Sequence, residues 1–182
     1  MMTCLFALFL TAEAAPPEIG PLATEEWVRE TNARWRGVGI GYDNGLWGSR
    51  FAQGLKVDVP LGNRLGQFLG VRARGTLVHN DANAQFAPVA MGGLELFGRG
   101  PVLLGVLRVY GGGGLYYGGA VGGEAAPATL AGGGHYGVEF LVSRRASFSF
   151  EVGGQGPLHP QEIDAGASVM AGSTVYLGRS RR

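Results

Sequence analysis

Apolar and polar side chains alternate along much of this chain, and the alternation predicts β-strands. Between Leu69 and Leu77, aliphatic or small side chains occupy every second position, and Arg72 and Arg74 lie between them. A period of two residues sends successive side chains to opposite faces of an extended strand. Strand-like runs follow one another from Trp35 onward, although glycine obscures the alternation in several. The predicted strands cover residues 35–43, 50–60, 66–79, 86–98, 102–117, 128–143, 146–154 and 165–178.

The predicted connections between these strands alternate in length. Tight turns are expected at residues 61–64, 99–101 and 143–145, and longer loops at residues 44–49, 80–85, 118–127 and 155–164. Strands that run up and down in sequence order place all the tight turns at one end and all the longer loops at the other. The fold class predicted for residues 35–182 is therefore all-β, an up-and-down antiparallel β-barrel of about eight strands.

The segment before the barrel is predicted to contain a signal peptide and a linker. An apolar run from Leu5 to Leu10, followed by Ala12-Glu13-Ala14, has the form of a secretory signal, which we place at residues 1–15. Residues 16–34 form the linker, and residues 23–34 are compatible with one or two helical turns. The sequence has no run of ~20 apolar residues, so it predicts no membrane-spanning helix.

Charged residues in the connections and at the strand ends are predicted to differ between the two ends of the barrel. Basic residues gather at the tight-turn end and acidic residues at the loop end, with Arg50 as the exception. The basic set is Arg64, Arg99, Arg144, Arg145, Arg179, Arg181 and Arg182, and the acidic set is Asp43, Asp81, Glu124, Glu162 and Asp164.

Composition narrows the class of protein further. The chain has 34 glycines among its 182 residues, and only 16% of its residues are charged. A soluble domain has about 25% charged residues on average. The formal net charge of +1 gives no reason to expect a nucleic-acid partner. Cys4 is the one cysteine and lies in the predicted leader, so we expect no disulfide and no thiolate metal site.

Alternation does not say which face of the barrel points inward. A membrane barrel turns its apolar face to lipid and its polar face to the lumen. The sparse and nearly balanced charges of the polar face favour this arrangement, because unpaired buried charges are costly. Apolar-face aromatics near strand ends, such as Phe51, Phe86, Tyr117, Tyr136, Phe140 and Phe148, would form interface girdles. The predicted lumen network is Lys56, Asp58, Arg72, Arg74, Glu95, Arg108, His135, Glu139 and Glu151.

Residues 35–178 resemble the small eight-stranded outer-membrane barrels of the OmpA/OmpX type. The segments that carry the resemblance are GVRARGTLV, HYGVEFLV and ASFSFEVGG, and the likeness is one of architecture. It implies a bacterial outer-membrane protein, exported through its signal peptide, whose partners are membrane lipids and a surface ligand held by the long loops. We expect a structural or surface-interaction role, a lumen filled by ionic contacts rather than an open pore, no cofactor and no metal.

Two other functions stay open. A soluble lipocalin-like barrel in the periplasm or outside the cell would place Leu69 and Val71 inside, around a small apolar ligand. A membrane lipid-modifying hydrolase would need a nucleophile near His135. Gly137 stands where lipid A deacylases of this class carry a serine, so Ser147 or Ser149 on a neighbouring strand would have to serve. We expect no enzymatic activity.

Overall fold

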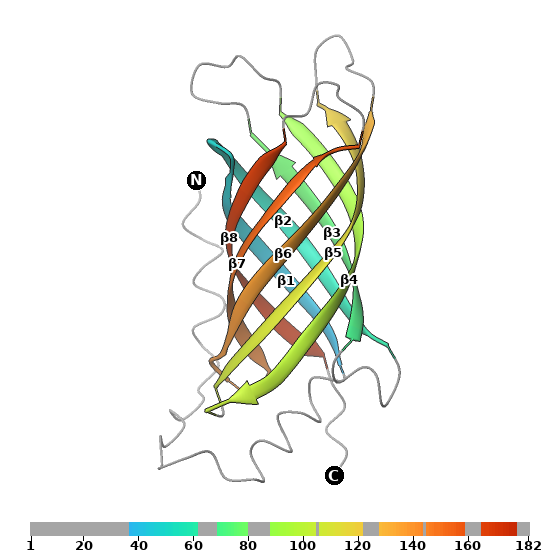
Figure 1. The fold of residues 1–182 in the computed structure, drawn as a ribbon. Coiled ribbons are helices and arrows are strands. Elements are labelled where there is room, and N and C mark those ends of the chain that lie inside the picture. Colours follow the sequence, from blue (N-terminus) through green and yellow to red (C-terminus); the bar gives the residue numbers. More distant parts are fainter. Residues whose placement is uncertain are drawn as a thin grey trace.

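Eight strands form a closed barrel in the computed structural model of this protein (Figure 1). The structure describes residues 37–61, 69–79, 88–104, 106–121, 128–143, 145–158 and 165–177. The strands are β1 (Val38–Trp47), β2 (Arg50–Pro60), β3 (Leu69–Val78), β4 (Val89–Leu103), β5 (Leu107–Ala120), β6 (Thr129–Leu141), β7 (Ala146–Pro157) and β8 (Gly166–Leu177).

Every strand pairs antiparallel with the next one in sequence, and β1 closes the barrel by pairing with β8. In that closing pair Val38 lies opposite Leu177 and Trp47 lies opposite Ser168. Closure leaves no free sheet edge, so every strand has two hydrogen-bonded neighbours. The predicted fold class, an up-and-down barrel of about eight strands, is confirmed.

The predicted alternation of short and long connections is wrong at the first loop. Residues 44–47 belong to β1, so the expected loop 44–49 shrinks to Gly48 and Ser49, where Gly48 has a φ of 57°. Glycine adopts this conformation without steric cost and suits a two-residue hairpin turn. At the other end, β2 ends at Pro60 and β3 begins at Leu69, and most of the expected tight turn 61–64 lies outside the described residues.

The predicted turn at Arg99-Gly100-Pro101 is also wrong, because these residues lie within β4. The pairing of β4 with β5 shifts between Arg99 and Val102, and β4 then continues to Leu103. A β-bulge of this kind accommodates proline inside a strand. Residues 118–120 and 155–157, which we expected in loops, likewise extend β5 and β7.

Several expectations lie outside the described residues. These are the signal peptide, the linker with its helical turns, loop 80–85, most of loops 118–127 and 155–164, and the girdle residue Phe86. Among the described residues, no helix has the length and hydrophobicity to cross a membrane.

The barrel turns its polar face inward. Lys56 is 1% exposed, and its neighbour Leu55 is 64% exposed. Large apolar side chains on all eight strands share the outward orientation, among them Ile40, Val59, Leu69, Leu94, Leu115, Phe140, Phe150 and Val169. A soluble lipocalin-like barrel requires the opposite orientation of the two strand faces, whereas here Leu69 points outward and Arg72 points inward.

Candidate functional site

Strand pairing gathers the predicted polar residues in the lumen. Lys56 of β2 lies opposite Arg74 of β3, and Asp58 lies opposite Arg72. Arg72 in turn lies opposite Glu95 of β4. The nine residues predicted for the lumen network have exposed fractions between 1 and 7%.

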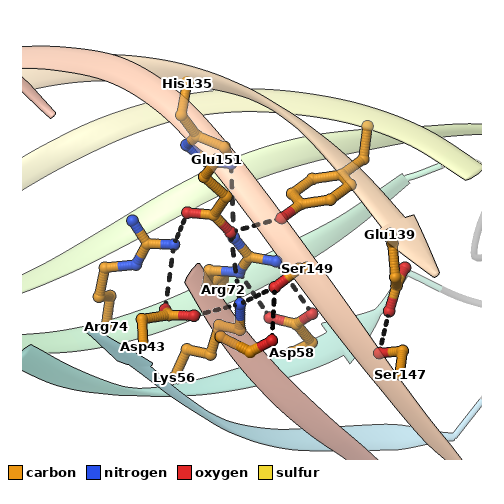
Figure 2. A network of polar contacts seen from close by, with 12 residues as sticks. Asp43, Lys56, Asp58, Arg72, Arg74, His135, Glu139, Ser147, Ser149 and Glu151 are labelled. Carbon is orange, nitrogen blue, oxygen red and sulfur yellow. Dashed lines mark hydrogen bonds and ion pairs between the residues drawn. The ribbon is translucent and has the colours of Figure 1, made fainter. Parts of the chain in front are cut away.

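Glu151 of β7 is the centre of the largest cluster, and Figure 2 shows the basic side chains that converge on it. Arg72 Nη1 donates to Glu151 Oε1 at 2.9 Å, and Lys56 Nζ donates to the same oxygen at 3.3 Å. Arg74 Nη2 donates to Oε2 at 2.5 Å, and the Tyr110 hydroxyl donates to Oε1 at 2.7 Å. One carboxylate therefore links β7 to β2, β3 and β5 across the lumen.

Asp43 and Arg99 extend this network, although the sequence placed both at the rims. Asp43 lies in β1 with its side chain buried, and Lys56 Nζ donates to its Oδ1 at 2.7 Å. Arg99 Nη2 donates to Asp58 Oδ2 at 2.7 Å, and Arg72 Nε donates to Asp58 Oδ1 at 2.6 Å. The predicted division of charge between the ends is therefore wrong for these two residues.

A second cluster surrounds Glu139 of β6. Arg108 Nη2 donates to Glu139 Oε2 at 2.5 Å, and the hydroxyls of Tyr176 and Ser147 donate to Oε1 at 2.6 and 2.5 Å. Arg99 Nη2 also donates to the Tyr176 oxygen at 3.2 Å, which joins this cluster to the one around Glu151. The buried charges among the described residues balance at five basic (Lys56, Arg72, Arg74, Arg99, Arg108) and five acidic (Asp43, Asp58, Glu95, Glu139, Glu151).

His135 is surrounded by charged and aromatic groups. Its Nε2 lies 3.4 Å from Arg72 Nη1, and its Nδ1 lies 3.7 Å from Glu95 Oε2. The two serines considered as nucleophiles bond elsewhere, since Lys56 donates to Ser149 Oγ and Ser147 Oγ donates to Glu139. The structure therefore does not assemble a serine–histidine pair from these residues.

Buried apolar side chains lie inside the barrel on both sides of the ionic clusters. At the loop end, a buried cluster contains Trp47, Ala52, Val78, Val89, Met91 and Met170. At the opposite end, Leu141 and Tyr176 pack with Val102. These layers were not predicted from the sequence, because apolar residues on the strands were expected to face outward. The signal that could have identified them is the alternation itself: the buried apolar residues stand at the same every-second positions as the inward-facing polar residues of their strands.

Glycines make room for the aromatic rings inside the barrel. Tyr116 lies directly across from Gly93, and a methyl group on Gly93 would lie 2.2 Å from Cδ1 of its ring. Tyr110 lies across from Gly137 and Phe97 across from Gly70 in the same way. The Tyr116 ring can therefore lie against the wall while its hydroxyl donates to Glu95 Oε1 at 2.6 Å.

We expect Gly93→Ala to destabilise the barrel by about 1–3 kcal/mol, because the added methyl group overlaps the Tyr116 ring. Gly92→Ala is the matched control, since Gly92 faces outward and a methyl group there would meet no atom within 4 Å. Urea unfolding of both variants in lipid vesicles measures the difference. Equal stability of the two variants would contradict the steric role assigned to Gly93.

Solved structures of other proteins share this fold. The N-terminal β-barrel domain of Pseudomonas aeruginosa OprF has a TM-score of 0.62 and 13% identity, covering 78% of this chain and 98% of that one. Neisserial surface protein A has a TM-score of 0.57 and 12% identity, covering 77% and 96%. A barrel from the de novo design of transmembrane β-barrels has a TM-score of 0.55 and 11% identity, covering 78% and 96%.

These likenesses establish the architecture of the chain. The predicted resemblance to small eight-stranded outer-membrane barrels is confirmed as a shared fold. No protein-family model matches the chain, and no curated protein matches its sequence.

Proposed function

We propose that this chain is an outer-membrane β-barrel protein with a structural or surface-interaction role, whose lumen is closed by its ionic network. The observation that carries the proposal is the inverted polarity of the barrel. Ten charged side chains are buried inside, whereas large apolar side chains cover the outside of all eight strands. Contact of such an apolar wall with water costs much free energy, whereas contact with lipid does not.

Backbone pairing and aromatic placement support a membrane location. In hydrocarbon every backbone polar group needs an internal partner, and a closed barrel supplies one through its strand pairs. Exposed Phe51 and Tyr117 lie toward the loop end, and exposed Phe140 and Phe148 lie toward the opposite end. Aromatic residues favour these interface levels in membrane barrels. The partners in this proposal are outer-membrane lipids, together with a surface ligand held by the connections 79–88, 121–128 and 158–165.

Cell fractionation with a gel-mobility assay tests the location. We expect the full chain to require detergent for recovery from the outer membrane. We also expect its mobility on a denaturing gel to differ between unboiled and boiled samples, because a closed barrel resists unfolding by detergent. Recovery as a soluble periplasmic or extracellular protein would contradict the proposal.

A closed lumen predicts that the barrel does not conduct ions. Purified barrel in planar lipid bilayers should give no stable single-channel steps, because apolar layers lie on both sides of a charge-balanced network. Conductance recordings on the purified protein measure this property. Reproducible ohmic steps from the folded barrel would show an open pore and refute the closed lumen, while leaving the membrane location intact.

A further inference from the structure

Four neighbouring polar side chains form a group on the described part of the outer wall. Tyr42 and Asn44 of β1, Gln53 of β2 and Ser173 of β8 point outward, and we call these four residues the polar strip. At the other outward-facing positions of the described strands, the residues are aliphatic, alanine, glycine, proline or aromatic, and the aromatic residues include Tyr117 and Tyr136, which lie apart from this group. Tyr42 is 39% exposed, Ser173 is exposed, and Asn44 and Gln53 are half-buried.

Strand pairing holds the polar strip together. Asn44 lies directly opposite Gln53, and Tyr42 lies directly opposite Ser173. The Tyr42 hydroxyl donates to Gln53 Oε1 at 3.1 Å, and Gln53 Nε2 lies 3.0 Å from His79 Nε2. Within the described part of the chain, the Asn44 amide forms no side-chain hydrogen bond, although it can donate two and accept two.

The polar strip lies within the apolar band, not beyond it. Leu46 and Phe51 are exposed on its loop-end side, and Ile40 and Val57 are exposed on its other side. Lipid headgroups stay at the edges of such a band, and acyl chains offer no hydrogen-bond partner inside it. A side-chain amide in hydrocarbon without a partner is costly, so we expect a protein surface to cover Asn44.

A second copy of this chain meets the chemical requirements of the polar strip. Its four side chains carry hydroxyl and amide groups without a formal charge, so two strips do not repel each other. An amide both donates and accepts, and a two-fold axis near Asn44 would therefore let the Asn44 amides of two copies bond each other. Ala171 lies directly opposite Asn44 on β8, and its small side chain permits close approach of the walls.

We infer that two copies of this chain associate in the membrane through the polar strip, with Asn44 near the two-fold axis. The inference rests on the membrane location proposed above. The contact is isologous, which means that the same patch of β1, β2 and β8 serves both copies. It leaves the lumen and the loops of each barrel free.

Disulfide capture tests this arrangement, because Cys4 is the only native cysteine and can be replaced by serine. The two variants compared are Asn44→Cys and Leu115→Cys, both made in the Cys4→Ser chain. Leu115 is the matched control, since it points outward from β5 on a distant part of the wall. Each purified variant is placed in phosphatidylcholine vesicles, oxidised with copper phenanthroline and analysed on a non-reducing gel. We expect a covalent dimer from Asn44→Cys and only background from Leu115→Cys.

A second measurement tests the role of the amides. Energy transfer between labelled barrels in the same vesicles should show that Asn44→Leu weakens dimerisation about tenfold, as expected for two lost hydrogen bonds in a membrane. Equal cross-linking of the two cysteine variants would overturn the inference. The inference would also be overturned if the Asn44→Cys variant, oxidised in native membranes, formed disulfides only with other proteins. Loss of the heat-dependent gel shift in vesicles would instead show that the membrane location itself is wrong.

Discussion

Replacing Glu151 by glutamine should destabilise the barrel by about 3–5 kcal/mol, the usual cost of removing one partner from a buried ionic cluster. The variant keeps the shape of the side chain but removes the charge that Lys56, Arg72 and Arg74 share. Three basic groups would then face one negative charge fewer inside the lumen. Urea titration in lipid vesicles, followed by the gel shift between folded and unfolded forms, measures the loss.

Three further variants, Arg145→Gln, Arg74→Gln and the double variant Glu151→Gln/Arg74→Gln, show whether the cost comes from charge balance. Arg145→Gln removes a charge from an exposed residue in the turn before β7 and should change stability by less than about 0.5 kcal/mol. The double variant Glu151→Gln/Arg74→Gln restores neutrality, because Arg74 Nη2 donates to Glu151 Oε2 at 2.5 Å. We expect the double variant to lose less stability than the two single losses combined. Strict additivity would show that these two residues do not act as a pair.

Replacing Leu94 by arginine should destabilise the lipid-embedded barrel by about 2–4 kcal/mol, as charged residues do near the middle of a membrane wall. Leu94 is 65% exposed on β4 and has exposed Leu96 as its outward-facing neighbour on that strand. The large expected effect depends entirely on the surroundings of the wall. In water, an exposed leucine could be replaced by arginine at almost no cost.

Leu104→Arg is the control for this prediction. Leu104 is 78% exposed, but it lies in the turn between β4 and β5, outside the strands. We expect its replacement to leave the urea midpoint in vesicles nearly unchanged. If the two variants unfolded at the same urea concentration, the wall of the barrel would not lie in lipid, and the proposed location would fail.

Much of this fold could be predicted from the order of residues alone. A strict period of two in segments such as 69–78 and 146–152 identifies strands and divides their side chains between two faces. Sparse, balanced charge on one face then favours a polar interior. Nine residues were expected in the lumen on these grounds, and the structure buries all nine inside the barrel.

The predicted strand ends were wrong where residues typical of turns lie in segments that the neighbouring strands pair with. Asp43-Asn44-Gly45 and Arg99-Gly100-Pro101 both have compositions typical of turns, so Asp43 and Arg99 were placed at the rims. The barrel keeps both segments in strands, because hydrogen bonds to the neighbouring strands outweigh the local preference. Their side chains then enter the lumen and complete its charge balance.

The partners of each side chain depend on the register between strands, and a period of two residues cannot encode that register. Alternation shows that Glu151 and Arg72 belong to the same face, but only closure of the barrel places β7 across the lumen from β3. The same holds for the outer wall. Asn44 and Gln53 are an unremarkable pair of polar residues in the sequence, and the pairing of β1 with β2 makes them neighbours on a surface that is otherwise apolar.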